Sequence, residues 1–136
     1  MVEIVYPDDT NSMGTLFGGR ALWLMDRLAF LVASRHARMP IVTACSEKVE
    51  FRAPVKEGDL IELRGRIGHV GRSSIRVDID MYAENLLTGC RILCTTGSFV
   101  MVAVDEKGRP VPVPPTQGEQ AADAHDEGAT PGRNDA

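Results

Sequence analysis

The sequence lacks the features typical of secreted, membrane-spanning and disulfide-built proteins. It holds three cysteines, Cys45, Cys90 and Cys94, an odd number for a disulfide framework. All three lie in apolar runs, which predicts buried free thiols in a reducing compartment. No apolar run approaches the roughly 18 residues of a membrane span, and the N-terminus shows no signal-peptide pattern. We therefore expect a cytoplasmic protein that has no membrane partner.

An excess of positive charge is also missing. Residues 116–136 hold five acidic side chains and one basic side chain, so this tail carries the whole formal charge of −4. The remaining chain has 14 basic and 14 acidic residues and offers no general field for nucleic acid or an anionic membrane. We expect no nucleic-acid partner. The tail has no large apolar side chain and is predicted to be disordered, which leaves residues 1–115 as one folded domain.

Hydrophobic periodicity predicts one helix followed by a sheet. Leu22, Met25, Ala29 and Val32 recur at helical spacing within residues 20–37, and the other flank of this helix is also mostly apolar, which predicts burial. A short extended piece over residues 3–6 and a loop over 7–12 precede it. Alternating residues then predict four long strands, over 41–51, from 59, from 74 and over 90–104. The expected fold class is α+β, an antiparallel sheet with a single helix across one face.

Asp26 is the most informative residue of the predicted helix. Its neighbours one turn away are apolar and cannot neutralise it: Leu22, Trp23, Ala29 and Phe30. A carboxylate on an apolar helix costs free energy unless it is paired or functional, so Asp26 is a candidate for acid/base or nucleophilic chemistry. The alternative is a structural salt bridge with an arginine from a strand, such as Arg52 or Arg66.

Two other motifs suit the recognition of a carbonyl and of phosphate. Gly18 and Gly19 stand at the helix start, where unpaired N–H groups favour developing negative charge, eight residues or about two turns before Asp26. The alternative for this pair is a tight turn or close packing of the helix on the sheet. The segment Arg72-Ser73-Ser74, between two predicted strands, can bind phosphate through its guanidinium and hydroxyl groups. Its alternative is a solvated hairpin.

The longest continuous motif runs from Pro7 to Asp26 and includes Asn11, Gly18 and Gly19. It resembles the signature of the hot-dog-fold acyl-CoA thioesterases of the bacterial YciA and brain acyl-CoA hydrolase type. The resemblance covers about residues 3 to 114 and continues in the family's order. The further matching segments are Val42-Thr43-Ala44, Val49-Glu50-Phe51 with Pro54, Gly58-Asp59, Val70-Gly71-Arg72-Ser73-Ser74, and Phe99-Val100 to Val104-Asp105.

The resemblance implies a hot-dog fold, one long central helix wrapped by an antiparallel β-sheet, and hydrolysis of acyl-CoA to a free carboxylic acid and coenzyme A. Asp26 matches the catalytic carboxylate, as general base or nucleophile, and Gly18 matches a backbone donor to the thioester carbonyl. Asn11 matches a catalytic residue brought from the neighbouring subunit, although by residue type alone it is a turn former. The expected substrate-binding residues are Gly19, Thr43, Ala44, Cys45, Arg72, Ser73 and Ser74.

The resemblance also implies a homo-oligomer whose unit is a dimer, assembled as a trimer of dimers with active sites at subunit interfaces. No cofactor is implied, because coenzyme A is part of the substrate. Cys90 and Cys94 have no second Cys or His pair at zinc-ligand spacing, so we predict no metal site.

Two alternatives to hydrolysis stay open. A hot-dog hydroxyacyl dehydratase requires a catalytic histidine, but His36 is predicted at the helix end, ten residues beyond Asp26, and His69 at a strand end. A non-catalytic acyl-CoA-binding or regulatory hot-dog module should lack a competent carboxylate, and Asp26 argues against it.

Overall fold

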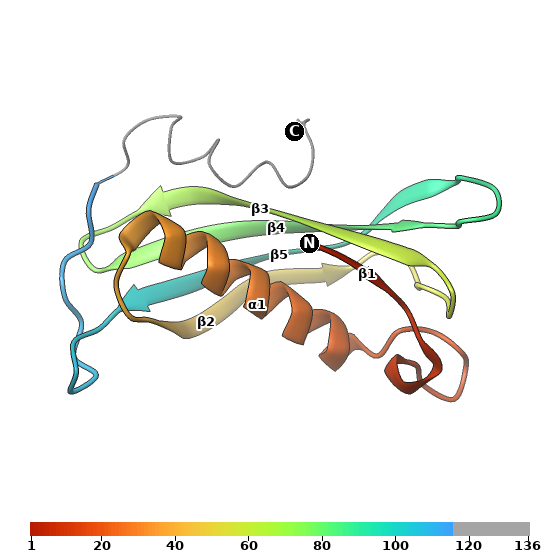
Figure 1. Ribbon diagram of the computed structural model, residues 1–136, viewed down its shortest axis with the longest axis horizontal. Coiled ribbons are helices and arrows are strands. Elements are labelled where there is room, and N and C mark those ends of the chain that lie inside the picture. The colour runs from red at the N-terminus through yellow and green to blue at the C-terminus, as the bar shows by residue number, and fades with distance from the viewer. Residues whose placement is uncertain (116–136) are drawn as a thin grey trace.

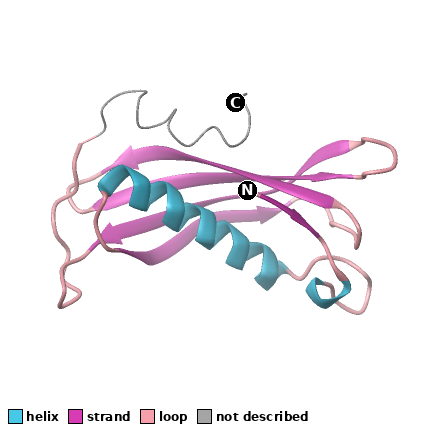
Figure 2. Ribbon diagram, viewed as in Figure 1, coloured by secondary structure: helices cyan, strands magenta, loops and turns pink. Residues whose placement is uncertain are grey.

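The computed structural model describes residues 1–115, so the predicted disorder of residues 116–136 lies outside the described residues. The elements are β1 (Val2–Ile4), the 3₁₀ turn η1 (Pro7–Asp9), α1 (Gly18–Ala37), β2 (Ile41–Phe51), β3 (Leu60–Val70), β4 (Ser74–Glu84) and β5 (Arg91–Ala103). The strands form one antiparallel sheet in the order β1-β3-β4-β5-β2. Helix α1 lies diagonally across one face of this sheet (Figure 1, Figure 2), which confirms the predicted α+β hot-dog architecture.

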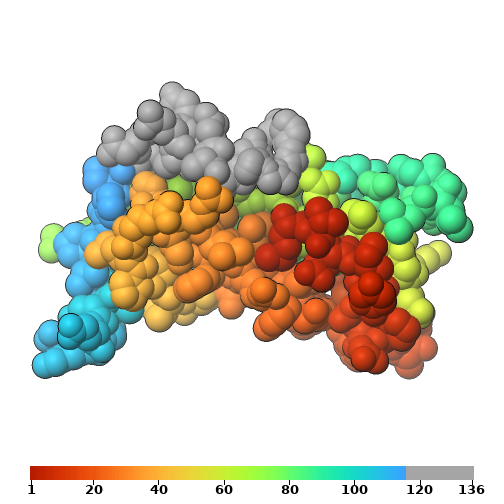
Figure 3. Space-filling view, in the orientation of Figure 1, coloured from red at the N-terminus to blue at the C-terminus, as the bar shows by residue number. Residues whose placement is uncertain are grey.

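Helix α1 buries one flank and exposes the other. Its buried side chains are small or apolar: Ala21, Leu24, Met25, Ala29, Val32, Ala33 and Ala37. Burying one of the larger of these side chains stabilises the fold by about 1.5–3 kcal/mol. Trp23 and Phe30 remain 46% and 45% exposed, and the space-filling view shows α1 residues at the molecular surface (Figure 3). The outer flank is therefore free to meet a ligand or another chain.

The inner face of the sheet follows the predicted alternation. Ile75, Val77, Ile79 and Met81 of β4 are buried under α1, whereas the residues between them are only half-buried. Gly65 of β3 permits a close approach, because a Cβ there would lie 2.9 Å from the Ile79 Cδ1 and 3.2 Å from both Leu28 and Val32. These contacts bring the helix onto the centre of the sheet.

Strand β2 forms one edge of the sheet. It pairs with β5 alone, and residues 42–48 are exposed. Register shifts between Thr43 and Cys45 and between Glu47 and Glu50 bend it, and Lys48 adopts a left-handed φ of 53°. A long exposed edge strand presents unpaired backbone groups that can pair with another chain. Within residues 1–115, no helix is long and apolar enough to cross a membrane.

Two local predictions were right only in part. The segment expected to be a loop begins with the single 3₁₀ turn Pro7–Asp9, because proline presets φ and the Asp9 carboxylate accepts the Tyr6 N–H at 3.0 Å. The three cysteines are free thiols, but only Cys94 is buried. Cys45 is exposed because it lies on the edge strand, and Cys90 because it lies in the hairpin turn before β5.

Candidate active site

Asp26 lies half-buried on the flank of α1 that faces β2. The hydroxyl of Thr43 donates a hydrogen bond of 2.6 Å to its Oδ1. This bond ties the carboxylate to the edge strand, while Oδ2 has no hydrogen-bond partner among the described residues. One oxygen is thus held in place and the other can accept a proton or attack a carbon.

The salt-bridge alternative for Asp26 is wrong. Arg52 pairs with Glu50 at 3.0 Å, and Arg66 pairs with Asp80 at 3.3 Å. Within residues 1–115, no basic side chain forms an ion pair with Asp26. The carboxylate is therefore anchored by a neutral hydroxyl rather than neutralised by a cation.

The start of α1 leaves hydrogen-bond donors open. Phe17 occupies the cap position and supplies no side-chain acceptor, and the first helical bond runs from the Ala21 N–H to the Phe17 carbonyl at 3.1 Å. The N–H groups of Gly18, Gly19 and Arg20 precede that bond and have no helical acceptor. Together with the helix dipole, they form a site for developing negative charge.

Asn11 shapes the loop that precedes α1. Its Oδ1 accepts the N–H groups of Met13 and Thr15 at 2.9 and 3.1 Å, and its Nδ2 donates to the Thr15 hydroxyl at 2.9 Å. The turn-forming interpretation is therefore correct within one chain. An amide nitrogen carries two hydrogens, so one Nδ2 hydrogen is left to donate elsewhere.

Except for Gly19 at the start of α1, the residues expected to bind coenzyme A lie toward one end of the sheet. Ser74 pairs with Val102 of β5, which in turn pairs with Val42 of β2, beside Thr43. Two strand spacings, about 10 Å, therefore separate the β3–β4 turn from β2. Within residues 1–115, Arg72 of this turn is exposed and forms no ion pair. Gly18 and Asn11 lie at the other end of the helix, so one chain does not gather all the predicted residues.

Neither histidine of residues 1–115 forms a hydrogen bond with the Asp26 carboxylate. His36 lies ten residues, about 15 Å, along α1 from Asp26, and its Nε2 contacts the Pro114 carbonyl at 3.0 Å. His69 lies at an irregularity near the end of β3. A histidine-based dehydratase therefore receives no support from the described part of the chain.

An apolar cavity of about 280 Å³ opens beside Gly18, and the sequence pattern did not predict it. Its walls come from Leu16, Gly18, Ala21, Phe51, Arg52, Ala53, Pro54, Val55 and Thr95. The Phe51 ring lies against the helix start, because a Cβ on Gly18 would lie 3.4 Å from the Phe51 Cζ. The cavity therefore adjoins the open N–H donors.

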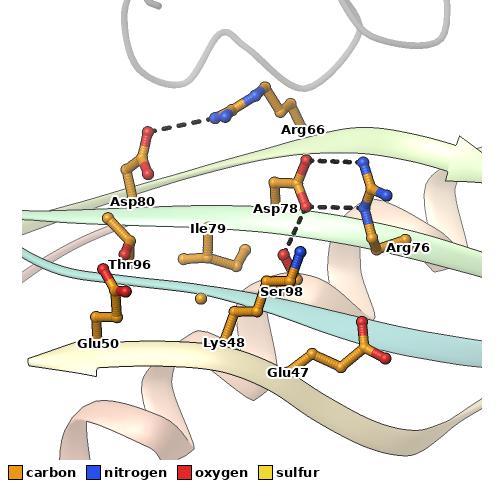
Figure 4. Close-up of a pocket in the computed structure, with 11 residues that line it drawn as sticks. Glu47, Lys48, Glu50, Arg66, Arg76, Asp78, Ile79, Asp80, Thr96 and Ser98 are labelled. Carbon is orange, nitrogen blue, oxygen red and sulfur yellow. Dashed lines mark hydrogen bonds and ion pairs between the residues drawn. The ribbon is translucent and has the colours of Figure 1, made fainter.

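The opposite face of the sheet carries a charged hollow of about 410 Å³, in which both arginines pair with aspartates (Figure 4). Arg76 binds Asp78 at 3.1 Å, and the Ser98 hydroxyl donates to Asp78 at 2.8 Å. Asp26 does not line this hollow. Among the described residues, no group of three or more His, Cys, Asp or Glu side chains is placed to hold a metal ion.

Comparison with known proteins agrees with this geometry. Residues 13–90 match the model of the thioesterase superfamily. A crystal structure of an apo-hexameric acyl-CoA thioesterase is 43% identical, with 89% of this chain and 79% of that chain covered and a TM-score of 0.81. The fold and the carboxylate-bearing helix define a hot-dog thioesterase domain. The chain belongs to the thioesterase superfamily.

Two further relatives carry names that bear on function. A Bacillus subtilis protein named as an uncharacterized acyl-CoA thioester hydrolase, YkhA, is 41% identical over 81% of this chain, and the match spans 64% of that protein, less than two thirds. A Staphylococcus aureus acyl-CoA hydrolase, solved with butyryl coenzyme A and coenzyme A, is 30% identical with a TM-score of 0.80, covering 85% of this chain and 70% of that one. Its structures include variants with alanine for an aspartate at its position 43 and for an asparagine at its position 28.

Proposed function

We propose that this protein hydrolyses the thioester of acyl-coenzyme A to a free carboxylic acid and coenzyme A. The observation that carries the proposal is the state of Asp26: a half-buried carboxylate on a largely apolar helix, anchored through Oδ1 by Thr43 and without a basic partner in residues 1–115. Membership of the thioesterase superfamily and the names of the relatives support it.

The chemistry needs a base or nucleophile and a site for the oxyanion. Asp26 either takes a proton from water as that water attacks the thioester carbon, after which the C–S bond breaks and the leaving coenzyme A thiolate receives the proton, or it attacks the carbon itself. In the second route the C–S bond breaks, coenzyme A leaves as its thiolate, and water then opens the resulting anhydride. The N–H groups at the start of α1 stabilise the charge that develops on the carbonyl oxygen. Neither route requires a metal or an organic cofactor, because coenzyme A enters as part of the substrate.

A complete site is proposed to need two chains. Gly18 and Asp26 are eight residues apart on one helix, about 12 Å along its axis, too far to contact one carbonyl group together. We assign Asn11 and Gly18 of one subunit and Asp26 of its neighbour to the same site, in a dimer that assembles further as a trimer of dimers. Hexameric relatives support an oligomer. The two alanine variants of the S. aureus relative lie 15 positions apart (43 and 28), as do Asp26 and Asn11.

The coenzyme A part of the substrate is assigned to two segments. Arg72, Ser73 and Ser74 would bind phosphate, since the Arg72 guanidinium forms no ion pair within residues 1–115. The exposed edge residues 43–45, Thr43-Ala44-Cys45, would contact the same moiety, and Gly19 would allow its close approach at the helix start. The free thiols support the proposed cytoplasmic location.

The direct test is a panel of acyl-CoAs from short to long, followed by release of free thiol. We expect Asp26→Asn and Asp26→Ala to fold, to retain affinity for coenzyme A, and to lose about 100-fold or more in turnover. Glu106→Gln, at an exposed position in the loop after β5, is the control and should keep full activity. Inertness of the wild type across the panel, or undiminished turnover of the Asp26 variants, would refute the proposal. Single turnover in ¹⁸O water tests the covalent route, because an anhydride that water opens at the enzyme carboxyl leaves label in Asp26, whereas general-base hydrolysis labels only the released acid.

A further inference from the structure

We propose that the apolar cavity beside Gly18 receives the acyl chain and that Phe51 limits the length of chain it accepts. The inference rests on the proposed thioester hydrolysis and adds a substrate class to it: linear acyl groups of short and medium length.

The walls of the cavity suit hydrocarbon rather than a charged group. Leu16, Ala21, Ala53, Pro54 and Val55 supply apolar surface around it. The one cation in the wall, the Arg52 guanidinium, already pairs with the Glu50 carboxylate at 3.0 Å. A carboxylate or phosphate entering the cavity would lose its hydration without gaining a free charge partner, whereas a methylene chain loses nothing.

The position of the cavity matches the reacting group. Gly18 belongs both to the cavity wall and to the open N–H donors at the start of α1. An acyl chain inside the cavity therefore leaves its carbonyl at the mouth, next to groups that stabilise an oxyanion. Thr95, only 2% exposed, also lines the cavity and is the single polar side chain in the buried core of the described residues.

The volume of the cavity sets the scale of the chain. At about 30 Å³ for a group the size of a water molecule, 280 Å³ accommodates about nine such groups. Phe51 is the largest side chain in the wall, and its ring is 55% exposed. Shortening Phe51 therefore enlarges the cavity without removing a buried part of the core, and enlarging the half-buried Ala53 fills it.

The decisive experiment measures affinity separately from turnover. In an Asp26→Asn background, dissociation constants are determined for acyl-CoAs from two to sixteen carbons. We expect affinity to rise about fourfold per methylene up to about eight or nine carbons and then to level off. Adding Phe51→Ala should move that limit to longer chains, and adding Ala53→Leu should move it to shorter ones. In proteins that retain Asp26, the same two substitutions should shift kcat/KM between neighbouring chain lengths about tenfold.

Leu87→Ala is the control, because this side chain is 96% exposed at the β4–β5 hairpin and does not line the cavity. It should leave the chain-length profile unchanged. If the wild type hydrolyses acyl-CoAs but neither Phe51→Ala nor Ala53→Leu moves either profile, the assignment of the cavity is wrong and the proposed function stands. If the wild type hydrolyses none of them, the proposed function fails, and the affinity series still decides what the cavity binds.

Discussion

The hydrogen bond between Thr43 and Asp26 offers a quantitative test of how the carboxylate is held. Thr43→Val keeps the branched shape of the side chain and removes the hydroxyl that donates to Oδ1 at 2.6 Å. A hydrogen bond to a charged acceptor contributes about 1.5–3 kcal/mol when buried. Because Thr43 is exposed and Asp26 half-buried, we discount this to about 1 kcal/mol. That energy corresponds to about a fivefold fall in kcat.

The assay compares kcat and KM of the wild type, Thr43→Val and Thr43→Ser with one acyl-CoA. Serine restores the hydroxyl and should recover most of kcat, which valine should not. If the hydroxyl positions Asp26, KM changes little in either variant. A higher KM with unchanged kcat in Thr43→Val would mean that Thr43 acts only as a coenzyme A contact, as the resemblance alone implies. A higher kcat would mean that the bond restrains a nucleophile.

Three further outcomes follow from the described contacts. Arg72→Ala should raise KM about tenfold with little change in kcat, and added salt should mimic it in steady-state kinetics; insensitivity to both would remove the phosphate assignment. Burial raises the pKa of Glu62, but hydrogen bonds and charge from Arg91 and a second arginine outweigh it and hold this pKa below its usual value. Stability from the ionised form is then present at neutral pH and lost as pH falls, so Glu62→Gln should cost about 1 kcal/mol in urea unfolding at pH 7 and less in acid; an equal cost at both would contradict this. Mixing inactive Asn11→Ala and Asp26→Ala subunits should restore about a quarter of the sites, and no recovery after confirmed exchange would mean that both residues act within one chain or that Asn11 only shapes its loop.

The fold was predictable because its elements follow simple periods. The four long strands begin within one residue of the positions that alternation predicts. Of the two strands whose ends were also predicted, β2 ends at the predicted residue and β5 one residue before it. The helix begins at Gly18, two residues earlier than expected. Glycine has a low helix propensity, so the sequence pattern does not mark Gly18 as part of a first helical turn, although tertiary packing allows that turn to form.

The site was predictable only in part. Asp26 is conspicuous in the sequence because its helical neighbours are apolar, but its partner Thr43 lies 17 residues away, and their contact depends on how the edge strand crosses the helix. Arg66 shows the opposite case. Arg64 and Arg66 are two residues apart on β3 and so lie on the same face of the sheet, the outer face, whereas Asp26 lies on the helix side. The period of the strand is therefore enough to exclude a salt bridge between Arg66 and Asp26 from the sequence alone.

The surroundings of Asp26 connect the exposed edge strand to catalysis. Trp23 and Phe30 flank the carboxylate one turn before and after it, and Val42 adjoins its partner Thr43; the three side chains are 46%, 45% and 47% exposed. Apolar surface of this kind around a functional group is typical of an interface rather than of a free surface. We infer that a second chain, docking along the free edge of β2, covers these side chains, removes water around Asp26 and brings the missing donors to it. On this proposal assembly completes the active site, because an isolated chain carries Gly18 and Asp26 about 12 Å apart along α1 and leaves each without its counterpart from a neighbouring chain.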